Sequence, residues 1–239
     1  MSAGWGEIDH IIVFCDSGAP EAEALKARGL HEGPRNSHPG QGTANRRFFF
    51  RNAYLELVWV ENAVEATSPG VRPTQMFDRW EARAGAACPF GLVYRPGKSP
   101  PAHEISAWTY TPKYFPKGFT IEVAHGIPAN EPLLFYLPFA RAALVEDVEL
   151  APGAARIGAI VDVTLHLPDT GSLSPALEAL VAAGSVKVEP GREYLLDLKH
   201  VGGSKGTIDM RPEMPLRFVP LALPAGSAGP GLSGRPIPH

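Results

Sequence analysis

Apolar positions near the start of the chain alternate with polar turns in a pattern that predicts strands and one helix. Residues 8–14 are rich in Ile, Val and Phe and end at an Asp-Ser-Gly turn, so we expect a largely buried strand. Pro20 suits the first turn of a helix, and Gly29 suits its C-terminal end. The β-rich runs at 45–51 and 54–60 predict a hairpin. With a short strand before this hairpin, the order of elements is β-α-β-β-β.

The same order of patterns returns about 153 residues later. The strand at 8–14 corresponds to one at 160–167, and the helix that begins at Pro20 corresponds to one that begins at Pro175. Further candidate strands follow as far as residue 218. Because a repeated order of elements indicates a repeated structural unit, we predict an α+β fold with two βαβββ modules.

The two units define the domain boundaries that we expect. The first module covers residues 1–63, the second covers 157–219, and a β-rich insertion or lid at 64–156 separates them. Several strand-like runs make this insertion too β-rich for a linker. Residues 220–239 are rich in Pro, Gly and Ser and have little to bury, which predicts a surface or disordered tail.

Composition restricts the class of protein and its partners. The chain has 239 residues, 44% of them hydrophobic, which suffices for a sizeable core. A net charge of -3 without a basic cluster argues against nucleic acid, and no apolar run approaches the roughly 18 residues of a membrane span. Cys15 and Cys88 lie far apart, and no secretory leader pattern opens the chain. We therefore expect a cytoplasmic protein with a small-molecule substrate or ligand, as a monomer or a homodimer.

Two polar residues inside the predicted strands are candidates for chemistry. Glu56 lies in the apolar run at 54–60, where a carboxylate is costly to bury unless it is paired, protonated or bound to a metal. An ion pair with Arg46 or Arg47 on the adjacent strand is one interpretation, and a ligand or general base is the other. His10 is either a hydrogen-bonded core histidine or a metal ligand.

Three motifs occur together in the first unit: Ile-Asp-His in the first strand, Tyr-Leu-Glu-Leu in the fourth, and the loop and strand at 38–46. Together they resemble the glyoxalase-like domain group of the vicinal oxygen chelate superfamily. The resemblance covers about residues 7–62 and extends to 157–218 through the internal repeat. It implies paired βαβββ modules whose curved mixed sheets enclose a cavity.

The resemblance also implies a divalent metal, such as Zn, Fe, Mn or Ni. Metal-dependent members bind the ion through a strand-one His and a strand-four Glu, which correspond to His10 and Glu56. In the second module the 153-residue offset places Val163 at the His position, where it cannot bind a metal. The Glu position falls on Asp209 at this offset or on Arg211 at an offset of 155, and only Asp209 could supply an oxygen ligand. The insertion offers two further ligands that could complete the site, Glu122 and His125.

Further candidate site residues follow from residue type and from position along the chain. Glu56 is a candidate general base, and His38 beside a glycine-rich loop is a candidate proton shuttle. Candidate substrate-binding residues flank that loop, or offer an arginine for a carboxylate or enolate oxygen, or an aromatic ring for a flat ligand. They are Asn45, Arg47, Trp59, Tyr110 and Arg211.

These observations leave two main functions open. The leading hypothesis is a glyoxalase-like enzyme in which a divalent cation at His10 and Glu56 stabilises an enolate or oxyanion of a small oxygen-bearing substrate, as an isomerase, lyase or dioxygenase. The alternative is a metal-free protein that binds or sequesters small molecules, of the bleomycin-resistance type, which Val163 favours. A third and weaker hypothesis is a scaffold protein whose cavity is filled by side chains.

Overall fold

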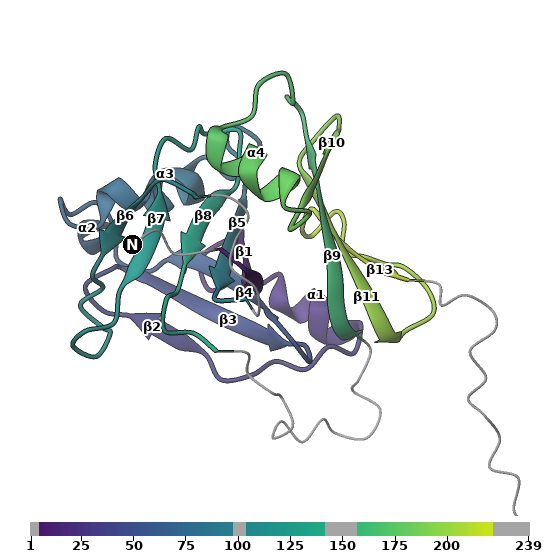
Figure 1. The fold of residues 1–239 in the computed structure, drawn as a ribbon. Coiled ribbons are helices and arrows are strands. Elements are labelled where there is room, and N and C mark those ends of the chain that lie inside the picture. The colour runs from purple at the N-terminus through teal and green to yellow at the C-terminus, as the bar shows by residue number, and fades with distance from the viewer. Residues whose placement is uncertain (1–4, 98–103, 142–156, 222–239) are drawn as a thin grey trace, which may run out of the picture.

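Two mixed β-sheets and a few short helices make up the fold, as the α+β prediction required (Figure 1). The computed structural model describes residues 5–97, 104–141 and 157–221. Most of the expected tail at 220–239 lies outside the described residues, as does part of the expected insertion. Among the described helices, none is long and apolar enough to cross a membrane.

The first half of the eight-stranded sheet is the βαβββ unit predicted from the start of the chain. Its strand order is β2-β3-β4-β1, with β1 parallel to β4 and the other neighbours antiparallel. The predicted strands and helix are therefore confirmed here. The elements are β1 (Glu7–Phe14), α1 (Ala22–Ala27), β2 (Asn36–His38), β3 (Thr43–Phe49) and β4 (Tyr54–Val60).

The second half of this sheet comes from the segment that we expected to be an insertion. Strands β5 to β8 repeat the pairing of the first half, with β5 parallel to β8 and antiparallel neighbours outside them, and β5 joins β1 at the centre. The repeat is hard to detect in the sequence because no helix separates β5 from β6 among the described residues. The strands are β5 (Phe90–Arg95), β6 (Ala107–Tyr110), β7 (Ile121–Ala124) and β8 (Leu133–Tyr136). Before β5 lie α2 (Ala63–Ala66), the 3-10 helix η1 (Arg72–Thr74) and α3 (Met76–Glu81).

The unit at 157–219 forms its own five-stranded sheet instead of completing the first one. Its strand order is β10-β9-β11-β13-β12, and β9 is parallel to β10, the strand that directly follows its helix. In the first unit, by contrast, β1 is parallel to β4, so the repeated strand-turn-helix sequence leads into different pairing. The elements are β9 (Ile157–Leu167), α4 (Pro175–Ala182), β10 (Lys187–Pro190), β11 (Leu195–Gly203), β12 (Ile208–Asp209) and β13 (Leu216–Pro220).

The two faces of the eight-stranded sheet pack against different partners. On one face, Ile11 and Leu57 belong to a buried cluster that includes Leu25 of α1 and Leu196 of the second sheet. The other face carries a separate cluster that contains Ile12 and residues of β5 to β8. The second sheet therefore supports the back of the first, and the front is left to form a cavity.

A β-bulge at Asp9 decides which side chains of β1 reach that front face. Ile8 pairs with Tyr94 and His10 pairs with Val93, so Asp9 is an extra residue in the ladder. Simple alternation along a strand would place His10 on the same face as Ile8. Ile8 instead packs against the rear cluster, and the bulge turns both Asp9 and His10 toward the front.

Candidate functional site

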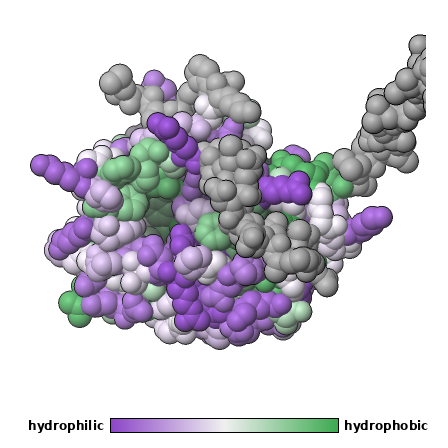
Figure 2. Space-filling view, turned by 90° about the horizontal axis from the view of Figure 1, so that it is seen from below, coloured by the Kyte–Doolittle hydropathy of each residue, from purple (hydrophilic) through white to green (hydrophobic). Residues whose placement is uncertain are grey.

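A cavity of about 330 Å³ lies against the front face of the eight-stranded sheet. This volume is at the lower end of the range of roughly 300–1,000 Å³ for small-molecule sites. Strands β1 to β4 supply most of its polar residues, while β5 to β8 and their connections supply mainly apolar and aromatic ones. Figure 2 shows a face of the molecule on which a hydrophobic patch borders a hollow.

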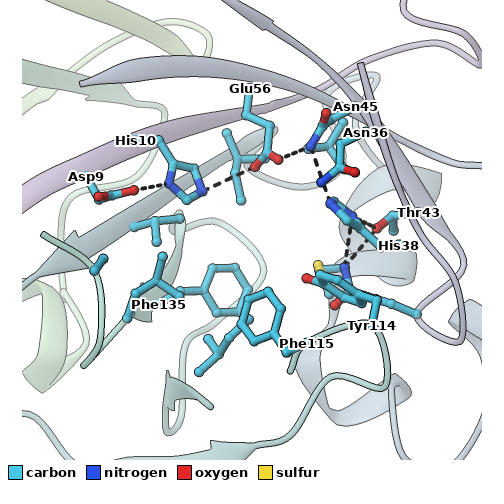
Figure 3. Close-up of a pocket in the computed structure, with 18 of the residues that line it drawn as sticks. Asp9, His10, Asn36, His38, Thr43, Asn45, Glu56, Tyr114, Phe115 and Phe135 are labelled. Atoms are coloured by element: carbon cyan, nitrogen blue, oxygen red, sulfur yellow. Dashed lines mark hydrogen bonds and ion pairs between the residues drawn. The ribbon is translucent and has the colours of Figure 1, made fainter. Parts of the chain in front are cut away.

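His10 lies between two carboxylates on the polar wall. Its Nδ1 is 2.8 Å from Asp9 Oδ1, and its Nε2 is 3.2 Å from Glu56 Oε2 (Figure 3). Burial alone lowers the pKa of a histidine, but Glu56 and Asp9 outweigh burial and raise the pKa of His10 to about 9. His10 is therefore an imidazolium at neutral pH, with both ring N–H groups donating to carboxylates.

Glu56 is a buried carboxylate that the neighbouring residues hold in its ionised form. Its side chain is only 9% exposed, and Asn45 Nδ2 donates a hydrogen bond to the oxygen that His10 does not contact. Burial raises the pKa of a carboxyl, but the charge of His10 and the hydrogen bonds from His10 and Asn45 outweigh it and lower the pKa of Glu56. Glu56 is therefore ionised at neutral pH, with an unprotonated carboxylate on the cavity wall.

Neither arginine that we considered as a partner of Glu56 pairs with it. Arg46 points to the rear of the sheet, where its guanidinium contacts Glu23 and Glu32. Arg47 lines the cavity, but its Nε donates to the backbone oxygen of Pro34, 3.0 Å away. The arginine interpretation of Glu56 is therefore not supported among the described residues.

His38 continues the polar wall beyond Asn45. Asn45 Nδ2 lies 3.4 Å from His38 Nε2, and His38 Nδ1 lies 2.8 Å from Thr43 Oγ1. The ring also stacks on Tyr114, with 4.6 Å between the centroids. Burial lowers the pKa of His38 below its usual range, so the ring is neutral. Because an amide N–H faces Nε2, that nitrogen carries the lone pair and Nδ1 carries the proton.

The opposite wall is largely aromatic and aliphatic. Phe115, Tyr114 and Phe135 lie across the cavity from His10 and Glu56 (Figure 3). The ring of Tyr110 and the side chains of Val93, Ile121 and Leu137 also line the cavity. A bound molecule would therefore have its polar atoms against one wall and its apolar atoms against the other.

The structure brings six of the predicted site residues to this cavity and leaves others elsewhere. Trp59 belongs to the rear core, and Asp209 and Arg211 form an ion pair of 2.6 Å on the second sheet. Glu122 accepts a hydrogen bond from Thr109 on the neighbouring strand and does not line the cavity. The six that line it are His10, His38, Asn45, Arg47, Glu56 and Tyr110.

Sequence reasoning missed several polar residues of the wall. Asp9 was visible inside the Ile-Asp-His motif, but alternation assigned it to the opposite face, and only the bulge brings it to the cavity. Gln41 and Thr43 lie in and after the glycine-rich loop, where Gln41 Nε2 donates to Thr43 Oγ1 over 2.8 Å. Their position within the 38–46 segment was the available signal.

The side chains present do not fit a divalent-metal centre. Both nitrogens of His10 face carboxylates, so its imidazolium has no lone pair for a metal. Where the second half of the sheet would supply further ligands, it presents Val93 and Phe135. No group of three His, Cys, Asp or Glu side chains among the described residues could hold a metal ion. We therefore derive no chemical step through a metal.

Comparisons with known proteins agree with the resemblance seen in the sequence. Residues 8–93 match the family model described as Glyoxalase-like domain, which confirms the resemblance to that domain group for this part of the chain. The match covers β1 to β4 and reaches into β5. No curated protein matches the chain.

Several solved structures share a limited similarity with the chain. A hypothetical protein from Staphylococcus aureus is 12% identical, covers 90% of this chain and 99% of its own, and has a TM-score of 0.48. A methylmalonyl-CoA epimerase from Streptomyces coelicolor, in complex with 2-nitronate-propionyl-CoA, is 13% identical, covers 58% and 100%, and has a TM-score of 0.37. A second methylmalonyl-CoA epimerase structure, with selenomethionine, is 14% identical, covers 59% of this chain and 100% of its own, and also has a TM-score of 0.37. These similarities are too low to indicate an activity.

Proposed function

We propose that this protein is a glyoxalase-like enzyme that moves a proton on a small oxygen-bearing organic substrate, with Glu56 as the general base. The observation that supports this most directly is the ionised Glu56 carboxylate, buried on the wall of a cavity between His10 and Asn45. Isomerase, epimerase and lyase reactions begin with such a proton transfer. The cytoplasmic location and the choice between monomer and homodimer stay predictions.

The first step that this geometry supports is proton removal next to a carbonyl group. Glu56 accepts the proton from carbon, and the electron pair of the broken C–H bond moves onto the carbonyl oxygen to give an enolate. Protonation removes the negative charge of Glu56, so the His10 imidazolium can then stabilise the developing oxyanion through Nε2–H. Asp9 keeps His10 oriented from the other side and is a positioning residue.

His38 supplies the second proton-transfer group. Its neutral ring, with a lone pair on Nε2, lies on the same wall beyond Asn45. A substrate that spans the wall could lose a proton to Glu56 and exchange another with His38. Return of the proton at a different atom gives an isomer, and return to the opposite face gives an epimer.

Hydrogen exchange from carbon tests this proposal without knowledge of the natural substrate. Hydroxyacetone, 2-hydroxyacetophenone and phenylpyruvate would each be incubated with the protein in deuterium oxide, and loss of the proton next to the carbonyl followed by NMR. We expect the wild type to accelerate exchange of at least one compound, and Glu56→Gln to abolish that acceleration. Glu122→Gln is the matched control, because Glu122 does not line the cavity. Equal exchange by wild type and Glu56→Gln would contradict the proposal.

The aromatic wall favours a second candidate, the metal-free binding protein. Phe115 and Phe135 face a cavity in which an apolar ligand could bind with no reaction. Under this alternative the compounds bind to the wild type without exchange, and His10→Ala leaves their affinity nearly unchanged. Binding that is accompanied by Glu56-dependent exchange supports the enzyme instead.

A further inference from the structure

Arg47 is a cation on the cavity wall that has no carboxylate partner among the described residues. It lies on β3 directly across from Glu56 on β4, and it lines the cavity. Glu56 is nevertheless held by His10 and Asn45. The Arg47 guanidinium lies over the Phe49 ring, 5.3 Å from its centroid, and within the described part of the chain only Nε has a hydrogen-bond acceptor. Its terminal N–H groups remain available to a ligand.

Among the charged side chains that line the cavity, Arg47 is the one that forms no ion pair within the described residues. His10 contacts both Asp9 and Glu56, and Asp9 also contacts Arg95, which contacts Glu7 as well. Arg47 therefore stands as a lone cation beside a paired cluster. An unpaired guanidinium with free terminal N–H groups favours an anionic group of a ligand over a neutral one.

The opposite wall indicates what the rest of such a molecule looks like. Phe115 and Phe139 line the cavity with ring centroids 5.4 Å apart, and Tyr114 lies 4.7 Å from Phe115. Phe139 is 38% exposed, a large apolar area for a side chain that borders a cavity. Burying exposed aromatic surface stabilises a complex, so this wall suits an aromatic or otherwise apolar body.

We propose that Arg47 binds the carboxylate of the substrate, and that the substrate class is small carboxylates with an aromatic or apolar body. This inference rests on the proposed function, because it places the reacting carbon beside Glu56. Residues directly opposite in an antiparallel pair have Cβ atoms about 4.5–5.5 Å apart. A carboxylate held by the Arg47 fork therefore brings a carbon two or three bonds away toward the Glu56 carboxylate, while the apolar body lies on the aromatic wall.

Binding of an isosteric pair of probes tests the inference separately from catalysis. The probes are 3-phenylpropanoate and 3-phenylpropanamide, which differ in charge but hardly in shape, and their dissociation constants would be measured by NMR titration. We expect the wild type to bind the carboxylate about tenfold more tightly or better, the range for a charge-assisted hydrogen bond. Arg47→Gln should remove this preference and leave amide affinity within about twofold. Arg51→Gln, an exposed arginine at the turn after β3, is the matched control.

Two further measurements keep the test decisive. Phe115→Ala should weaken binding of both probes, because it removes part of the apolar wall and leaves Arg47 intact. In the wild type, added salt should weaken binding of the carboxylate probe and leave binding of the amide probe unchanged. The inference is therefore testable even if Arg47→Gln folds poorly. The inference would be overturned if the wild type bound both probes with equal affinity, or if Arg47→Gln reduced the affinity for both probes equally. Neither outcome would affect Glu56-dependent exchange, which tests the proposed function by itself.

Discussion

Asp9 and His10 are consecutive residues of β1, yet Asp9 Oδ1 accepts a hydrogen bond of 2.8 Å from His10 Nδ1 inside one cavity. Neighbouring side chains of a regular strand point to opposite faces, and the bulge at Asp9 removes that separation. The consequence is electrostatic. A carboxylate on each side holds the imidazolium of His10, which in turn holds Glu56 ionised.

Replacement of Asp9 by Asn should lower the pKa of His10. Burial lowers the pKa of this histidine, and the variant removes one of the two carboxylates that raise it to about 9. NMR titration of isotope-labelled histidine side chains measures the change directly. Glu7→Gln is the control, because Glu7 contacts Arg95 at the exposed end of the same strand and does not touch His10. A pKa that stays near 9 in Asp9→Asn would show that Glu56 alone controls His10.

The raised pKa of His10 also predicts how stability depends on pH. A histidine whose pKa rises from 6.5 in the unfolded chain to about 9 in the folded one stabilises the fold fully below pH 6.5. That contribution is lost as the pH rises through 9. Urea unfolding of wild type and His10→Gln at a series of pH values should therefore show a stability difference that narrows between pH 6.5 and 9. A difference that widens over this range would contradict the ion pair.

Arg79 of α3 should be a major contributor to stability although it lies outside the cavity. Its side chain is 1% exposed, and its guanidinium donates to the backbone oxygens of Ala129, Pro128 and Glu131 at 2.5–2.6 Å. Arg79→Ala leaves these acceptors without partners and should lower the free energy of unfolding by about 3 kcal/mol or more.

Chemical denaturation measures this loss, and a surface arginine provides the comparison. Arg72 forms a 3.2 Å ion pair with Asp78, and both side chains are about half exposed. Arg72→Ala should therefore lower the free energy of unfolding by less than about 1 kcal/mol. Equal losses in the two variants would mean that the buried contacts of Arg79 contribute little.

Much of the first unit could be predicted because its signals are local. Apolar runs, Pro20 and Gly29 define β1 and α1 within a few residues. The same kinds of local signal identified β9 and α4 at the start of the second sheet. Strand pairing is not local. The sequence of β9 and α4 repeats that of β1 and α1, but β9 then pairs with β10, and β5 to β8 complete the first sheet without a matching sequence repeat.

The candidate site was predictable where one residue conflicted with its surroundings. Glu56 in an apolar strand required a partner, and the structure supplies His10 and Asn45. The bulge that adds Asp9 left no clear trace in the pattern of apolar residues. Asp209 was selected from a sequence offset that assumed equal pairing in both units, and the different strand order places it on the second sheet.

Metal analysis tests the sequence-based ligand set against the geometry of the site. Protein purified without a histidine tag or chelator should contain far less than one divalent ion per chain, because both nitrogens of His10 donate to carboxylates and leave no lone pair for a metal. Added zinc, iron, manganese or nickel should not raise the melting temperature, since an ion that does not bind the native state cannot stabilise it. His10→Ala and Glu56→Ala should leave both results unchanged. Near-stoichiometric metal in the wild type, lost in both variants, would mean that the His10–Glu56 ion pair opens to bind a cation, and Glu56 would then be a ligand rather than a base.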